Sequence, residues 1–168
     1  MTESQNRLYR DPNLQIVFAV TLIVVMGVSS ISPAFPEIQA AFGISKPTVG
    51  LLIVVFTLPG VLFTPVLGVL ADRFGRKKVL VPSLLLFGVA GCACSLARDF
   101  NLLLTLRFLQ GIGAASLGVL NVTIIGDLYS NSKRQLATAM GYNATVLNIG
   151  LPGYLIIGGA LASLAWYY

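Results

Sequence analysis

Five long apolar runs, separated by short polar segments, dominate the chain. Each run is long enough for a membrane-spanning helix, because about 20 residues at a rise of about 1.5 Å cover the hydrocarbon core of a bilayer. The sequence therefore predicts an all-α membrane protein, a bundle of five transmembrane helices preceded by a cytoplasmic N-terminal tail over residues 1–13. The expected spans are residues 14–34, 47–70, 79–97, 102–128 and 136–164.

The composition points to lipid as the main solvent of the chain. Of its 168 residues, 56% are hydrophobic and only 10% are charged, whereas soluble domains carry about 25% charged residues. Histidine is absent, and the six acidic residues all lie away from the middle of the apolar runs. This supply of side chains does not suit a metal cluster or a Ser-His-Asp triad. We therefore expect no enzyme activity, no metal and no cofactor.

The basic residues predict how the chain is oriented. Eight of the 11 lie on the side of the N-terminus, whereas Lys46 and Arg98 lie on the opposite side and Arg107 lies within a span. The eight are Arg7, Arg10, Arg73, Arg76, Lys77, Lys78, Lys133 and Arg134. An excess of Lys and Arg marks the cytoplasmic side, so we predict a cytoplasmic N-terminus and, after five spans of the cell membrane, an outer C-terminus. Basic residues divided among short loops do not form a phosphate-binding stripe, so no nucleic-acid partner is expected.

The segment Gly68–Leu80, between the second and third spans, holds the densest run of charge. Its Arg76 can form a forked pair with a carboxylate. We predict a charged latch of Asp72, Arg76 and Asp127, because Asp127 ends the fourth span on the same side; the alternative is that the basic residues only fix topology. We also expect Asp72 at a helix start, Gly75 at the chain reversal and Gly68 at a close helix crossing.

Other polar residues lie inside the spans. A charge such as that of Arg107 is costly in lipid and marks a functional site by default; the alternative is that it reaches back to the outer headgroups. Further groups are candidates for a substrate cavity, although each also fits a hydrogen bond within or between helices. They are Ser29, Ser30, Gln110, Asn121, Asn143 and Asn148.

Several of these segments match one known family. Gly68–Leu80 meets every specified position of the signature Gly-x-Leu-Ala-Asp-Arg-x-Gly-Arg-Lys and so resembles the loop between helices two and three of the major facilitator superfamily. Leu106–Gly113 is similar to the family's second motif in helix four, and Gly126–Tyr129 is similar to the inner end of that helix. Ser32–Ile38 resembles the end of helix one in drug–proton antiporters. The resemblance covers nearly the whole chain.

The resemblance implies roles for individual residues. An inward-gate latch would comprise Gly68, Asp72, Arg73, Gly75, Arg76 and Asp127, and Arg107, Gln110 and Gly111 would serve proton coupling. Two departures stand out. Tyr154-Leu155 occupies the place where antiporters carry Gly-Pro before Gly158-Gly159. The family has twelve helices in two halves, and this chain ends where a sixth helix is expected.

Two functions follow as expectations. The first is a secondary transporter, namely proton-coupled efflux of a small lipophilic compound, of which this chain is the N-terminal part. The alternative is a non-transporting membrane module that self-associates or binds partner helices. Expected partners are membrane lipid, a small-molecule substrate, protons, and either a missing C-terminal half or a second copy of the chain. Arg107 cannot exchange protons near neutral pH, so coupling would need an acid such as Glu37 or one in the missing half.

Overall fold

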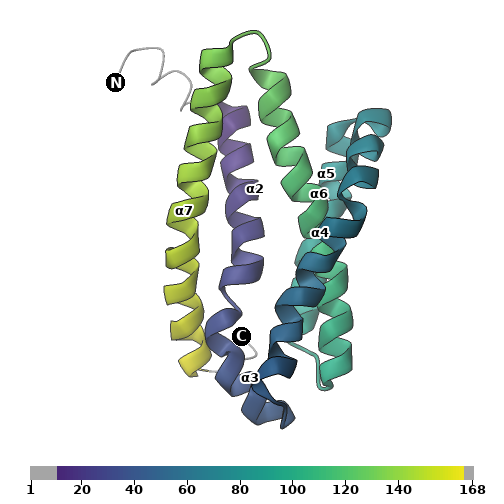
Figure 1. Cartoon of the computed structure of the whole chain (residues 1–168), viewed down its shortest axis with the longest axis vertical. Helices are drawn as coiled ribbons and strands as arrows, with labels where there is room; N and C mark the ends of the chain where they lie inside the picture. Colours follow the sequence, from purple (N-terminus) through teal and green to yellow (C-terminus); the bar gives the residue numbers. More distant parts are fainter. Residues whose placement is uncertain (1–10, 165–168) are drawn as a thin grey trace.

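The computed structural model describes residues 11–164, which form a bundle of helices (Figure 1). In chain order they are α2 (Pro12–Ser29), the 3-10 turn η1 (Ser32–Ala34), α3 (Phe35–Phe42), α4 (Lys46–Phe74), α5 (Arg76–Cys94), α6 (Phe100–Leu128) and α7 (Lys133–Leu164). Within residues 11–164, five segments are long and apolar enough to cross a membrane. The prediction of an all-α bundle of five such segments is confirmed.

The first span differs from its predicted form. Helix α2 ends at Ser29, and Pro33 and Pro36 then open η1 and α3, where their missing N–H groups are tolerated. The stretch expected to be an outer connector is therefore helical as far as Phe42, and Gly43 ends it in a left-handed conformation (φ 63°). At the other end of the span, Asp11 caps α2 and Pro12 begins it, so the tail stops two residues earlier than predicted. Residues 1–10 and 165–168 lie outside the described part, and the sides on which the termini lie remain predictions.

Helix α6 is the centre of the bundle. It packs along α4 and α5 and also contacts α2, which in turn lies beside α7 (Figure 1). The other long helices α4, α5 and α7 each contain an internal proline, whereas α6 contains none over its 29 residues. Proline-free helices lack the commonest cause of sharp kinks.

Glycines let the helix backbones touch at two crossings. A Cβ atom added at Gly111 of α6 would lie 2.2 Å from the carbonyl oxygen of Phe56 in α4. One added at Gly158 of α7 would lie 2.4 Å from the carbonyl oxygen of Ser30, just after α2. Close approach through small residues is how helices associate in lipid, where the hydrophobic effect does not drive them together.

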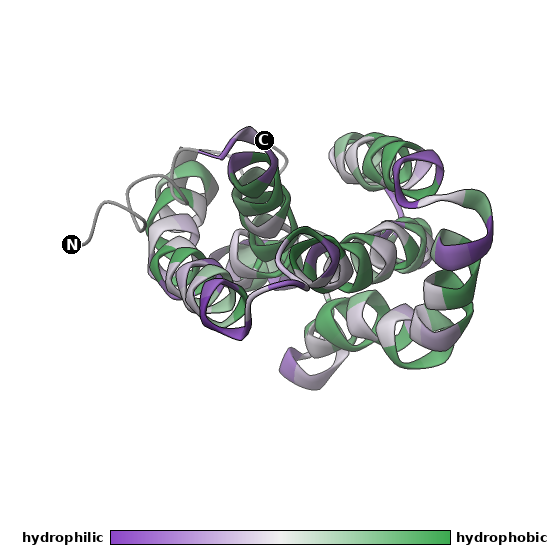
Figure 2. Cartoon of the chain, turned by 90° about the horizontal axis from the view of Figure 1, so that it is seen from above, coloured by the Kyte–Doolittle hydropathy of each residue, from purple (hydrophilic) through white to green (hydrophobic). Residues whose placement is uncertain are grey.

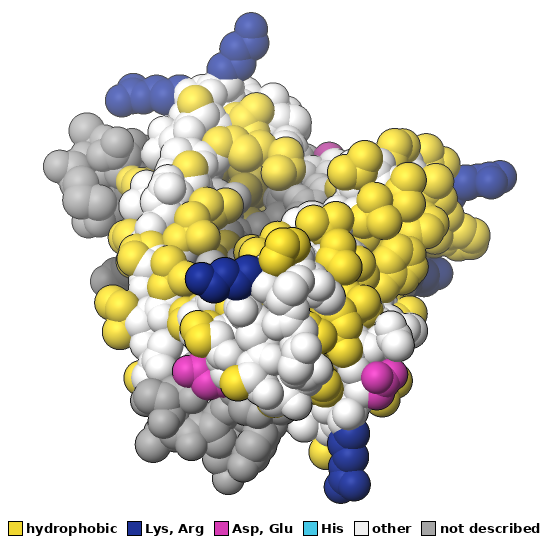
Figure 3. All heavy atoms as spheres, turned by 60° about the horizontal axis from the view of Figure 1, so that its bottom comes forward, with side chains coloured by type: hydrophobic (Ala, Val, Ile, Leu, Met, Phe, Trp, Pro, Cys, Tyr) yellow, Lys and Arg dark blue, Asp and Glu magenta, His cyan; other side chains and the backbone are white. Residues whose placement is uncertain are grey.

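The outer surface of the bundle is apolar. Val61, Ile156 and Ile149 are 78%, 74% and 68% exposed. Hydrophobic residues occur along the long helices (Figure 2), and on the face drawn in Figure 3 hydrophobic side chains spread widely while Lys and Arg side chains stand out from the surface. Such a surface suits a hydrocarbon solvent, and helices satisfy their own backbone hydrogen bonds there.

The charged turns divide between the two ends of the bundle. The start of α2, the α4–α5 turn and the α6–α7 turn lie at one end (Figure 1). The start of α4, with Lys46, and the turn before α6, with Arg98, lie at the opposite end. This separation is the one that the charge pattern predicts. We refer below to the end with the α4–α5 turn as the inner end, and its position in the cytoplasm remains a prediction.

Candidate functional site

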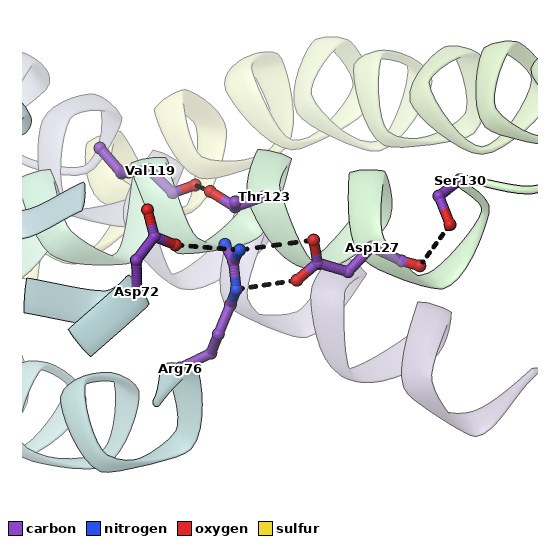
Figure 4. Close-up of polar contacts among 6 residues, drawn as sticks. All are labelled: Asp72, Arg76, Val119, Thr123, Asp127 and Ser130. Atoms are coloured by element: carbon purple, nitrogen blue, oxygen red, sulfur yellow. Dashed lines mark hydrogen bonds and ion pairs between the residues drawn. The ribbon is translucent and has the colours of Figure 1, made fainter. Parts of the chain in front are cut away.

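Three charged side chains meet at the inner end, and we call Asp72, Arg76 and Asp127 the ionic clasp (Figure 4). Arg76 Nε lies 2.8 Å from Asp127 Oδ2, and Arg76 Nη2 donates to Asp127 Oδ1 at 3.4 Å. The same Nη2 lies 3.1 Å from Asp72 Oδ1. The Arg76 guanidinium at the start of α5 therefore joins the end of α4 to the end of α6. Its Nε and Nη2 contact the two oxygens of the Asp127 carboxylate, the forked pairing typical of arginine.

Local structure places the clasp residues. Gly75 adopts φ 91°, a value that non-glycine residues rarely take, and it separates α4 from α5 so that Arg76 begins the new helix. Asp72 is not at a helix start, as predicted, but in the last turn of α4, because that helix continues to Phe74. The close crossing expected at Gly68 is also absent, since a Cβ there would only touch Val119 at 3.9 Å.

The helix dipoles oppose all three charges of the clasp. Asp72 and Asp127 lie at C-terminal helix ends, where negative charge is unfavourable, and Arg76 lies at an N-terminal end, where positive charge is unfavourable. Their mutual attraction offsets these three costs. The clasp is also partly exposed, with the side chain of Asp127 59% accessible. Exposed ion pairs contribute about 0–1 kcal/mol and weaken in salt, so the arrangement suits a contact that opens and closes.

Asp127→Asn should loosen the inner end of the bundle. The substitution removes the charge that joins α6 to Arg76, while Asp72 remains paired within the α4–α5 turn. With Cys92 and Cys94 replaced by alanine, a cysteine introduced at Thr123 should react several-fold faster with a membrane-impermeant maleimide. Arg73→Gln is the matched control, because the Arg73 side chain is exposed and makes no ion pair within the described residues. Equal reaction rates in Asp127→Asn and the parent would contradict a gating role.

The second arginine of interest, Arg107, is buried in the middle of the bundle. Only 8% of it is exposed, and its Nη1 donates to the Gly27 carbonyl oxygen of α2 at 2.9 Å and to Gln110 Oε1 at 3.0 Å. Its guanidinium carbon lies 6.0 Å from the centre of the Phe56 ring, within range of a cation–π contact. The alternative that Arg107 reaches the outer headgroups is therefore wrong in this structure.

Gln110 and Gly111 share the environment of Arg107. Gln110 is buried and accepts the Arg107 hydrogen bond, and Gly91 of α5 leaves room for it, since a Cβ there would lie 2.8 Å from Gln110 Nε2. Gly111 brings the backbone of α6 against α4. The predicted coupling residues thus lie together. The sequence analysis missed Gly27 and Gly91, which also surround Arg107 and Gln110. The only sequence feature that pointed to them was a small residue within an apolar run.

A cavity of about 640 Å³ adjoins this arginine, between α2, α5, α6 and α7. Of the predicted cavity residues, Ser30 and Gln110 line it. Ser29 is buried with an unpartnered Oγ and does not line it. Asn148 is exposed on α7 and donates to its own helix at Ala144. The cavity is therefore less polar than the predicted set implies.

Asn121 and Asn143 instead form a polar cluster with Thr21 that joins three helices. Asn121 Nδ2 of α6 donates to the hydroxyl of Thr21 in α2, and that hydroxyl lies 2.5 Å from Asn143 Oδ1 of α7. Hydrogen bonds of this kind link helices in lipid. Sequence reasoning missed Thr21, because a single threonine in an apolar helix most often bonds to its own backbone, as Thr21 also does at Val17.

Tyr129 ties the start of α2 to the end of α6 just outside the apolar spans. Its hydroxyl donates to Asp11 Oδ2 at 2.9 Å, and Asp11 Oδ1 caps α2 by accepting from the backbone N–H of Asn13. Burial, followed by the hydrogen bond to Asp11 and the negative charge of that carboxylate, raises the pKa of Tyr129 from 10.0 to about 12.

Alkaline pH should therefore destabilise the fold through Tyr129. Below pH 10 the folded and unfolded chains both keep the proton, whereas between pH 10 and about 12 the unfolded chain ionises first, so stability falls as pH rises. A phenolate absorbance titration of the folded protein, minus that of Tyr129→Phe, should show one tyrosine titrating near pH 12. A difference curve centred at pH 10 would contradict the contact with Asp11.

Within residues 11–164, no group of three or more His, Cys, Asp or Glu side chains gathers where a metal ion could bind. The site consists instead of a surface ion-pair cluster at one end of the spans and a buried arginine beside an apolar cavity. These features define a polytopic membrane protein with charged contacts between its helices.

The chain belongs to the major facilitator superfamily. The sequence model of the Major Facilitator Superfamily matches residues 17–168. Among similar proteins, the Bacillibactin exporter of Bacillus subtilis is 31% identical over 92% of this chain and 40% of the exporter. Protein spinster homolog 3 of Danio rerio is 35% identical over 95% of this chain and 32% of that protein. The Quinolone resistance protein NorA of Staphylococcus aureus is 26% identical over 89% of this chain and 38% of NorA. The chain thus spans 40% or less of the length of these three relatives.

Proposed function

We propose that this chain is part of a secondary transporter that exports small lipophilic compounds across the cell membrane in exchange for protons. The observation that carries the proposal is the ionic clasp, a partly exposed contact of one arginine with the ends of two other helices. A transporter that works by rocking helix bundles needs such a contact, because the inner end must close and open in each cycle. Two relatives, named as an exporter and as a drug-resistance protein, support the direction of transport.

The proposal assigns roles to the remaining residues. Gly75 forms the turn that places Arg76 in the clasp, and Arg107 with Gln110 and Gly111 holds α6 against α2 and α4. The proton carrier must be an acid, because arginine keeps its proton. Glu37 fits this role, since it lies half-buried in α3 with an unpartnered buried Oε2. The second bundle is supplied by further chain or by a second copy, and the inner end faces the cytoplasm.

Flux measured in proteoliposomes tests the proposal. The purified protein, this chain together with its second bundle, is reconstituted, the lumen is acidified, and uptake of ethidium, a lipophilic cation, is followed by fluorescence. We expect uptake that a protonophore abolishes and that Glu37→Gln reduces by about tenfold or more. Gln39→Glu, which restores an acid two residues away on the same helix, should not rescue it, because two residues along a helix change the facing direction.

A folded protein that contains this chain and a second bundle, yet carries no proton-driven flux, would overturn the proposal. It would favour the alternative of a membrane module that assembles with partner helices. Cross-linking in the same vesicles would then show which helices the module contacts.

A further inference from the structure

The cavity beside Arg107 has mostly apolar walls. Its lining residues come mainly from α2, α5, α6 and α7. Apolar side chains such as Ile23, Leu84, Ile157 and Leu161 line most of it, and its polar lining residues include Arg107, Gln110, Ser30 and Ser95. A volume of about 640 Å³ falls within the range of small-molecule sites, which are largely apolar with a few polar groups that orient the ligand.

The guanidinium of Arg107 has unused hydrogen-bonding capacity. It carries five N–H donors, yet both of its hydrogen bonds within the described chain come from Nη1. The buried Nε has no partner there. Arg76 shows what this edge of a guanidinium binds, because its Nε and Nη2 hold the two oxygens of Asp127. The corresponding edge of Arg107 lacks a carboxylate.

The described residues supply no carboxylate for Arg107. Both of their ion pairs belong to Arg76. A buried guanidinium without a counter-charge is costly, and an anionic group brought by a ligand removes that cost. The apolar walls select a ligand with a hydrocarbon body, and the single cation selects one negative charge.

We propose that this cavity binds an amphiphilic carboxylate, with its hydrocarbon chain between α5 and α7 and its carboxylate on the guanidinium of Arg107, which lines the cavity. The inference goes beyond the proposed transport function, because it names a ligand that the cavity binds whether or not that ligand is moved. Binding itself rests on the cavity and the arginine.

Photolabelling tests the site directly. The purified chain is placed in phosphatidylcholine nanodiscs and labelled with a diazirine-bearing fatty acid, and the labelled peptides are mapped by mass spectrometry. We expect labels on α5 and α7 that dodecanoate displaces, whereas dodecanol and dodecyltrimethylammonium do not. Arg107→Met should reduce labelling by about tenfold or more, because charge-assisted hydrogen bonds are lost.

Two glycines provide a matched pair that leaves Arg107 in place. Gly88 lines the cavity, and a Cβ there meets nothing within 4 Å, so Gly88→Leu should fill the space and abolish labelling. Gly118 also has open space around it but lies outside the cavity, so Gly118→Leu should label normally. Equal displacement by dodecanol, or full labelling of Gly88→Leu, would overturn the proposal.

Two further measurements distinguish a free carboxylate from a membrane lipid, and ligand binding from transport. If phosphatidylglycerol in the nanodiscs displaces the label as well as dodecanoate does, the occupant is a membrane lipid and the proposed free carboxylate is wrong. Specific labelling without ethidium flux would support this site while the transport proposal fails. Flux without specific labelling would overturn this site alone.

Discussion

Gly111→Ala should be among the most destabilising single-methyl changes in this protein. The added Cβ would lie 2.2 Å from the Phe56 carbonyl oxygen and 3.0 Å from the Phe56 carbonyl carbon and Pro59 Cγ. A backbone carbonyl cannot rotate away as a flexible side chain can, so α6 and α4 must separate. Overpacking of this kind costs about 1–3 kcal/mol of unfolding free energy, and we expect the detergent-solubilised protein to melt about 5 °C lower or more.

Gly118→Ala is the control for this prediction. Gly118 lies on the same helix with nothing within 4 Å of its added Cβ. Alanine is the better helix former by about 1 kcal/mol, so this variant should melt at the same temperature as the parent or higher. Equal melting temperatures for the two variants would mean that α6 does not press against α4 as described.

Arg107→Met should strongly reduce proton-driven flux with little change in stability. The substitution leaves the Gly27 carbonyl oxygen and Gln110 Oε1 without the hydrogen bonds that Arg107 donates, a cost of about 1–3 kcal/mol each. It also removes a buried charge that lacks a carboxylate partner among the described residues. Burying a charge costs several kcal/mol, so the two effects are opposite and similar in size, and we expect a melting temperature close to that of the parent.

Flux and melting are measured on the same purified variant. Flux should fall by about tenfold or more if Arg107 orients α6 during transport. Arg98→Met, which removes an exposed arginine of the turn before α6, should leave both flux and melting unchanged. An Arg107→Met protein that melts earlier yet still transports would show that the residue is structural only.

The sequence alone was sufficient to predict the number of spans and the partners in the clasp. Asp72, Arg76 and Asp127 each follow or precede an apolar run of known length, so counting spans places them at one membrane face. The details of the turn were less predictable. We expect Asp72 at a helix start, but α4 continues to Phe74 and the chain turns only at Gly75, which adopts a positive φ that other residues rarely take.

The polar residues within the spans were the hardest to assign. The sequence shows that Asn121, Asn143 and Asn148 lie in apolar runs. It does not show how each helix is rotated about its axis, and therefore which neighbours these side chains face. Two of them point at Thr21 and the third lies on the surface. The rotation depends on close backbone contacts such as those at Gly111 and Gly158, which involve residues far apart in the chain.

The absence of proline from α6 has a mechanical consequence. Asp127 and Arg107 lie on this one helix, 20 residues apart, a separation of about 30 Å along its axis. A stiff rod turns as a whole, so any tilt that strains the salt bridge at the inner end of α6 must also shift the guanidinium of Arg107 inside the bundle. Leverage can thus couple the inner end to the buried interior, with no chain of intermediate proton carriers between them.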